Sequence, residues 1–189
     1  MSALRRGETA RLPGIREIWG AFRELCADLK ATEARSVERR LGRLWGARIL
    51  AALGRVFQRE FGQTPGEVRL SSWVEALGDT CERAELGRCS FDFEDADVGL
   101  VHVWQYDCPL AADDRLAGFA ASFLEGFYAG ILPRLVGRPV EVLWLATEPR
   151  RRILRFLVGT PARLAAAHWR LGNRPTVTEG LGAGAEGTA

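Results

Sequence analysis

The residues with the clearest potential for chemistry are thiols and one imidazole in the middle of the chain: Cys81, Cys89, His102 and Cys108. Thiolate and imidazole are the usual ligands of zinc, so this set is the candidate metal site. Its spacings match no common zinc template, and cysteine is also often buried as a small hydrophobe. We therefore favour buried thiols, with Cys81 and Cys108 able to approach each other while Cys89 and His102 need not join them. We predict a hydrogen-bonded structural role for His102, and no bound metal or cofactor.

The charged clusters also have structural explanations. Three carboxylates flank the start of a predicted helix: Asp107, Asp113 and Asp114. The helix dipole and capping already favour negative charge there. The densest basic group falls in a predicted hairpin turn: Arg150, Arg151, Arg152 and Arg155. A solvated turn is the favoured explanation, and the alternative is an acidic protein partner or an anionic membrane surface. No nucleophile elbow, phosphate loop or dinucleotide fingerprint appears, so no catalytic residue is assigned.

The stretch from residue 113 to residue 136 has the spacing of a buried helix with two distinct faces. One face carries large apolar side chains, among them Phe119, Phe123 and Phe127. The other repeats small residues at every fourth position: Gly118, Ser122, Gly126 and Gly130. Because interior glycine costs a helix roughly 0.5–1 kcal/mol, such a ridge needs a reason, and close packing within the fold or across a dimer comes first. The alternative is a ligand slot lined by the phenylalanines, Gly126 and Gly130, with Trp104 and Trp144 as walls.

Periodicity sets the order of the elements that must hold these residues. Helical spacing predicts an amphipathic helix at 12–30, a second helix from a Ser36 cap to Gly62, and a third from Ser72 to Gly87. Alternating residues then predict a hairpin before the central helix and a second hairpin after it, with these strands: 89–94, 100–106, 140–147 and 153–158. This order predicts an α+β fold, with helices packed on a four-stranded antiparallel sheet made of two hairpins that flank a long central helix.

Length and composition fit one globular domain with loose ends. The chain has 189 residues, 47% of them hydrophobic and 26% charged. We predict an N-terminal extension at 1–35, a domain at 36–171, and a disordered tail at 172–189. The formal net charge of +2 gives no electrostatic case for nucleic acid. No secretory signal or membrane span is predicted, and free thiols favour a reducing, cytoplasmic setting. Nearly every basic residue is arginine, a bias typical of GC-rich, and here of bacterial, genomes.

Three segments resemble the 4-vinyl reductase, or hydrocarbon-binding, domain family, which is related to core subunits of the transport protein particle (TRAPP). The segment Leu41–Arg48 is similar to the family's leucine-glycine helix. The segment Cys108-Pro109-Leu110 with Gly118 and the run at 123–130 is similar to its glycine-bearing central helix. Residues 138–158, including Arg155-Phe156, resemble its closing hairpin. The resemblance covers about residues 36–160 and implies a TRAPP-subunit-like fold.

Two departures limit what the resemblance implies about chemistry. Reductase-type members carry two cysteines in the closing hairpin, and those places hold Ala146 and Leu154 here, which cannot bind a metal. TRAPP-type members can carry an acylated cysteine in the loop after the first long helix, and the corresponding loop at 61–66 has no thiol. We therefore expect a non-catalytic homodimeric module that binds a hydrophobic small molecule or a partner protein. The alternatives are an enzyme or accessory acting on a tetrapyrrole such as bacteriochlorophyll, and a TRAPP-like scaffold for a small GTPase.

Overall fold

A single antiparallel sheet forms one layer of the molecule. The computed structural model describes residue 22, residues 28–112 and residues 114–172. The sheet has four strands in the order β1-β2-β4-β3, and every neighbouring pair is antiparallel. The strands are β1 (Arg88–Asp92), β2 (Leu100–Tyr106), β3 (Glu141–Glu148) and β4 (Ile153–Gly159). The two hairpins therefore join through β2 and β4, and the sequence-based prediction of two hairpins around a central helix is confirmed.

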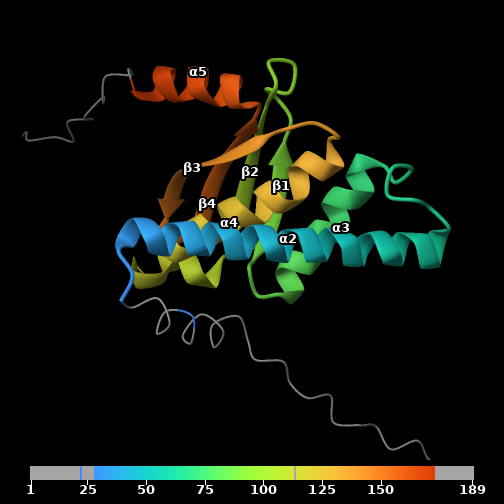
Figure 1. Cartoon of the computed structure of the whole chain (residues 1–189), viewed down its shortest axis with the longest axis horizontal. Helices are drawn as coiled ribbons and strands as arrows, with labels where there is room; N and C mark the ends of the chain where they lie inside the picture. The colour runs from blue at the N-terminus through green and yellow to red at the C-terminus, as the bar shows by residue number, and fades with distance from the viewer. Residues whose placement is uncertain (1–21, 23–27, 113, 173–189) are drawn as a thin grey trace, which may run out of the picture.

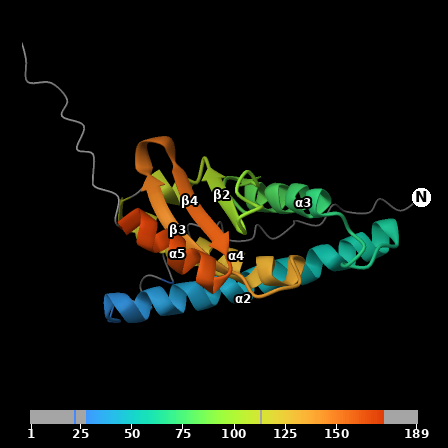
Figure 2. The same cartoon turned by 90° about the horizontal axis from the view of Figure 1, so that it is seen from above.

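The helices pack on one face of that sheet and around its ends. They are α2 (Ala31–Phe61), α3 (Leu70–Arg83), α4 (Asp114–Leu135) and α5 (Pro161–Gly172), and two short 3-10 turns lie at η1 (Pro109–Ala112) and η2 (Pro149–Arg151). Figure 2 shows α4 between the sheet and α2, while the other face of the sheet carries no helix of the described chain. Figure 1 shows α3 beside β1 and α5 across one end of the strands.

The first long helix begins earlier than its predicted cap. It starts at Ala31, so Ser36 lies inside α2, and the backbone N–H of Lys30 instead donates to Glu33 Oε2 at 3.2 Å. Its end was predicted correctly, because Gly62 follows it with φ of 67°, a left-handed conformation that glycine adopts without strain. Similarly α3 begins at Leu70 rather than at Ser72. Most of the predicted helix at 12–30 and the tail at 173–189 lie outside the described residues.

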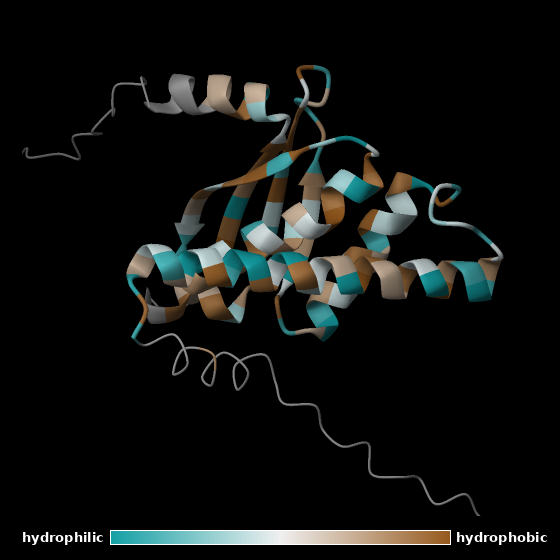
Figure 3. Ribbon diagram, viewed as in Figure 1, coloured by the Kyte–Doolittle hydropathy of each residue, from teal (hydrophilic) through white to brown (hydrophobic). Residues whose placement is uncertain are grey.

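The core lies between α4 and the inner face of the sheet. On α4, Leu124, Tyr128 and Ile131 are fully buried, and the Tyr128 ring lies 5.6 Å from that of Phe156 on β4. Figure 3 shows the outward surface of α2 as a mixture dominated by hydrophilic residues, while the strands behind it are largely hydrophobic. This distribution places the centre of the apolar core at α4, as the periodicity of residues 113–136 indicates.

The small-residue ridge of α4 is used inside the fold, against a matching ridge on α2. Each of these glycines would place an added Cβ closer than 3.0 Å to a backbone oxygen of the other helix: Gly42, Gly46, Gly126 and Gly130. The oxygens belong, in the same order, to Phe123, Phe127, Arg39 and Arg43. The two helices thus approach to backbone contact, which only glycine permits. Gly118 is different, because nothing lies within 4 Å of its added Cβ.

Candidate functional site

The phenylalanines predicted to line a ligand slot form a packed ladder in the core. The rings of Phe119, Phe123 and Phe127 follow one another at 6.1 and 6.4 Å between centroids, and all are buried. Trp45 of α2 covers the last two at 5.5 and 5.4 Å, and Phe22 lies 5.8 Å from the Phe119 ring. Opening a slot between these rings requires Trp45 or Phe22 to move.

The two tryptophans predicted as walls of that slot lie elsewhere. Trp104 points from β2 to the outer face of the sheet, away from α4, where its ring stacks on Tyr106 at 6.0 Å. The guanidinium of Arg155 lies over the same indole at 4.3 Å. Trp144 stands on the edge strand β3 and is 41% exposed. The structure therefore does not bring Trp104 together with the phenylalanine ladder.

Three thiols converge at one end of the core, although no described set of three or more His, Cys, Asp or Glu residues has an arrangement that could hold a metal ion. Cys81 hydrogen-bonds Cys89 across the contact between α3 and β1, and Cys108 lies close enough to influence Cys81 electrostatically. The hydrogen bond to Cys89 and burial raise the pKa of Cys81 well above its ordinary value. Burial likewise raises the pKa of Cys108. Cys89 thus joins Cys81 and Cys108, which the sequence left open; Cys81 and Cys108 are buried and Cys89 is half-buried.

His102 stays apart from the thiols. Its side chain lies on the outer face of the sheet, and its Nε2 is 3.2 Å from Asp95 Oδ2. The hydrogen bond predicted for His102 is therefore present, and its structural role stays a prediction. The buried polar residues near the thiols are Tyr128 and Gln105 rather than His102. The Tyr128 hydroxyl donates to Gln105 Oε1, and Gln105 Nε2 donates to the Leu86 carbonyl at 3.0 Å.

The charged clusters are pairs and surface groups. Asp107 accepts a hydrogen bond from Arg88 at 2.8 Å on an exposed part of the sheet end, while Asp113 and the side chain of Asp114 lie outside the described residues. In the basic turn, Arg150, Arg151 and Arg152 are exposed, and Arg151 reaches Glu148 at 3.6 Å. Arg155 leaves this group for the Trp104 ring. These positions match the solvated turn that the sequence favoured.

An apolar cleft opens where α2, the connection to α3 and the end of α4 meet. We call it the α2–α3 cleft; its volume is about 680 Å³, and it is lined by Leu50, Ala51, Gly54, Arg55, Gln58, Pro65, Gly66, Val68, Leu70, Trp73, Arg134 and Leu135. Its deeper lining is apolar, because Leu50, Val68 and Trp73 are 9%, 7% and 2% exposed. A volume in this range suits a small organic ligand.

Local hydrogen bonds and one glycine keep the cleft in shape. The Trp73 indole N–H donates to the Pro65 carbonyl at 3.4 Å, and the Phe57 ring packs edge-on against that indole at 4.9 Å. The connecting turn is closed by Glu67, whose Oε2 accepts from both the backbone N–H and the hydroxyl of Thr64 at 2.7 Å. An added Cβ at Gly54 would lie 3.3 Å from the Pro65 ring, so glycine leaves the space open.

Two guanidinium groups give this apolar cleft a cationic part. Arg55 on α2 and Arg134 on α4 both line it, both are exposed, and neither forms an ion pair within the described residues. The sequence analysis missed this site because its apolar residues fit equally well as ordinary core positions. The available signal was Gly54, a third glycine in the same helix as Gly42 and Gly46, followed by the Pro65-Gly66 turn.

Comparisons with known proteins define the fold. A scan against family models found no match, and a search of curated proteins found none. Among solved structures, the phenol-responsive sensory domain of the transcription activator PoxR with phenol is 17% identical and superposes with a TM-score of 0.55, covering 84% of this chain and 80% of that one. A trafficking protein particle complex subunit 3 from Naegleria fowleri, covalently bound to palmitic acid, is 13% identical, with a TM-score of 0.52 and coverage of 75% and 90%.

A vinyl-4-reductase family protein from Methanocaldococcus jannaschii also matches, at 11% identity and a TM-score of 0.45, over 75% of this chain and 74% of that one. The chain therefore has the α+β fold shared by the PoxR sensory domain and the trafficking particle subunit. The resemblance drawn from the sequence is confirmed at the level of the fold.

One described helix is long and apolar enough to cross a membrane. It is the segment Leu116–Leu135 within α4, with a mean hydropathy of 1.3. However, 72% of that window is buried inside the fold, because α4 lies between the sheet and α2. Its apolar character is thus explained by its place in the core.

Proposed function

We propose that the protein is a non-catalytic module that binds a hydrophobic small molecule in the α2–α3 cleft. The observation that carries this proposal is the cleft itself, which combines a deep apolar lining with an open mouth. Burying apolar ligand surface contributes roughly 25 cal/mol per Å², so such a lining favours a hydrophobic ligand. The unpaired Arg55 and Arg134 leave room for a ligand with one acidic group.

The fold gives the proposal its context. The PoxR sensory domain was solved with phenol, and the trafficking particle subunit with covalently bound palmitic acid. Both ligands are largely apolar, so hydrophobic ligands are compatible with this fold. The residues that line the α2–α3 cleft include no cysteine, so the proposed binding is noncovalent and reversible.

Binding is tested with the fluorescent probe 1-anilinonaphthalene-8-sulfonate, an apolar ring system with one anionic group. We expect saturable fluorescence enhancement by the folded wild-type chain, and its loss in Ala51→Trp, which fills the cleft from an exposed position of α2. The matched control Ala96→Trp places the same side chain in the exposed turn between β1 and β2 and should bind the probe normally.

The same experiment tests the slot predicted from the sequence. If Phe123→Ala changes probe binding while Ala51→Trp does not, the ligand enters the phenylalanine ladder, and the assignment to the α2–α3 cleft is wrong. If neither variant changes a saturable signal, the probe binds elsewhere and the proposed site is refuted.

A homodimer, or a contact with a partner protein, is a second part of the proposal. Its support is the outer face of the sheet, which no helix of the described residues covers and where Trp104 lies between Tyr106 and Arg155. Aromatic residues and arginine are enriched in protein interfaces.

Native mass spectrometry of freshly purified protein measures the oligomeric mass and detects any retained ligand or metal in the same experiment. A dimer that retains an apolar molecule supports the proposal, whereas a coloured pigment favours the tetrapyrrole alternative and a bare dimer the scaffold alternative.

A further inference from the structure

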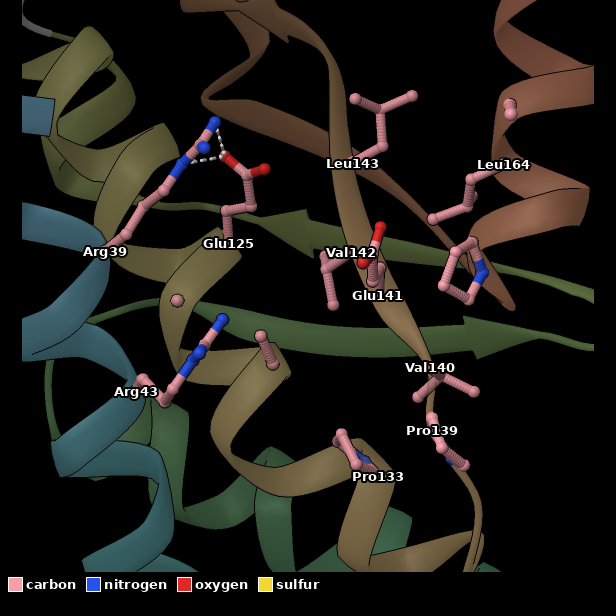
Figure 4. Close-up of a pocket in the computed structure, with 14 residues that line it drawn as sticks. Arg39, Arg43, Glu125, Pro133, Pro139, Val140, Glu141, Val142, Leu143 and Leu164 are labelled. Atoms are coloured by element: carbon pink, nitrogen blue, oxygen red, sulfur yellow. Dashed lines mark hydrogen bonds and ion pairs between the residues drawn. The ribbon is translucent and has the colours of Figure 1, made fainter. Parts of the chain in front are cut away.

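A second concavity lies on the other half of α2, away from the α2–α3 cleft. It is bounded by α2, α4, the edge strand β3 and the first turn of α5, and its volume is about 780 Å³ (Figure 4). We call it the α2–β3 groove, defined by Arg39, Arg43, Glu125, Val140, Val142 and Leu164. Unlike the cleft, it is lined by charged groups of both signs as well as by apolar groups.

Glu125 is a buried carboxylate, and one of its two oxygens accepts no hydrogen bond from the described residues. It is only 7% exposed, and Arg39 donates to its Oε2 from Nε at 2.9 Å and from the terminal nitrogen at 2.8 Å. Both bonds go to the same oxygen, so Oε1 has no hydrogen-bond partner among the described residues, and Figure 4 shows it turned toward the groove. Burial raises the pKa of Glu125, and the Arg39 charge opposes that effect.

Arg43 supplies a free cation one helical turn further along α2. It forms no ion pair within the described ranges, and its guanidinium points into the groove in Figure 4. The close contact between α2 and α4 fixes the backbone positions of both arginines. Gly126 lies against the backbone of Arg39, and Gly130 lies against that of Arg43. Four residues of helix rise place the two positions roughly 6 Å apart along α2.

The opposite wall is mainly apolar, with Glu141 as its charged residue. Val140 and Val142 of β3 and Leu164 of α5 line it, and Val142 and Leu164 are 8% and 6% exposed. The charged side chains that line the groove balance, since Arg39 and Arg43 are matched by Glu125 and Glu141. A ligand without net charge therefore fits better than a simple anion or cation, which would leave one sign uncompensated.

We propose that the α2–β3 groove binds a free α-amino acid with an apolar side chain. The ligand carboxylate pairs with Arg43, the ammonium group donates to Glu125 Oε1, and the side chain packs against Val140, Val142 and Leu164. An α-amino acid carries both charges on one carbon, which matches a groove that is lined by both the carboxylate acceptor of Glu125 on α4 and the cation of Arg43 on α2. This site is independent of the hydrophobic ligand proposed for the α2–α3 cleft.

Isothermal titration of the full chain with L-leucine tests the assignment. We expect saturable binding of leucine and much weaker binding of N-acetyl-leucine, which lacks the ammonium group, and of leucinamide, which lacks the carboxylate. Arg43→Gln should weaken leucine binding by about tenfold or more, the effect of losing one charge-assisted hydrogen bond. The matched control Arg48→Gln removes an exposed arginine of α2 that does not line the groove, and should bind leucine normally.

Three results would overturn the assignment. They are the absence of saturable leucine binding, equal binding of N-acetyl-leucine, and unchanged affinity in Arg43→Gln with a folded circular dichroism spectrum. Loss of leucine binding in Ala51→Trp would also overturn it, because that substitution fills only the α2–α3 cleft. Since Ala51→Trp leaves the groove intact, failure of the hydrophobic-ligand proposal does not change the expected leucine result.

Discussion

Gly118 and Gly126 stand two helical turns apart on α4 and have opposite surroundings. The space beside Gly118 is open, whereas an added Cβ at Gly126 would overlap the backbone of Arg39. Spacing alone gives both residues the same significance, because the four-residue repeat includes each of them. The contact partner decides which glycine is required, and that partner comes from a helix more than eighty residues away in the chain.

Alanine substitutions at these two positions should therefore change stability in opposite directions. Gly118→Ala should raise the free energy of unfolding by about 0.5–1 kcal/mol, the helix-propensity gain. Gly126→Ala should lower it by about 1–3 kcal/mol, because the backbones of α2 and α4 must move apart. Urea denaturation of both variants beside the wild type measures the two shifts. A gain at Gly126 equal to that at Gly118 would mean that the helices do not touch there.

At the scale of elements, the periodicity of apolar residues predicted all four strands and the central helix. The alternation in 89–94 and 100–106 placed β1 and β2 within about two residues, and the predictions for β3, β4 and α4 were as accurate. Starts of helices were less certain, since Ser36 and Ser72 both have cap-forming side chains but lie inside α2 and α3. Periodicity also cannot predict the strand order, because the pairing of β2 with β4 depends on contacts between segments that are distant in the sequence.

Gln105 shows how one side chain joins three elements. From β2 it accepts from the Tyr128 hydroxyl on α4 and donates to the Leu86 carbonyl in the connection between α3 and β1. Burial raises the pKa of Tyr128 well above its ordinary value, so the phenol stays protonated and donates. In sequence, Gln105 reads as a solvent-facing position of an alternating strand, so its burial was not predicted.

Removing the Tyr128 hydroxyl should lower the free energy of unfolding, because the buried Gln105 side chain loses a hydrogen-bond partner. Tyr128→Phe leaves Gln105 Oε1 without its donor, and we expect a loss of about 1–3 kcal/mol in the free energy of unfolding. The matched control Tyr106→Phe alters a hydroxyl on the outer face and should stay within about 0.5 kcal/mol of wild type. Equal stabilities of the two variants in denaturant titrations would contradict a structural role for this network.

At the scale of the whole molecule, the two concavities explain why the candidate site was harder to predict than the fold. Phe119, Phe123 and Phe127 have the spacing of a ligand face, but Trp45 and Phe22 cover them. The cleft and the groove instead lie where α2 meets α4 and other elements, so each is lined by residues from at least three elements. Spacing within one element cannot reveal such a site, whereas the order of elements was enough to predict the fold.

The boundary between the N-terminal extension and the domain, predicted at residue 36, can be tested through Phe22. Its ring lies 5.8 Å from that of buried Phe119 and at a steep angle, the edge-to-face geometry that aromatic pairs favour. If the segment before α2 belongs to the folded unit, Phe22→Ala should lower the free energy of unfolding by about 1–2 kcal/mol. The matched control is Phe93→Ala, which removes a ring that is 45% exposed and stacks only at 6.4 Å on Phe91, and it should cost less than about 1 kcal/mol. Thermal and urea unfolding of both variants decide between the two views. Equal, small effects would mean that the core of this protein is complete without the extension, and that the domain begins with α2.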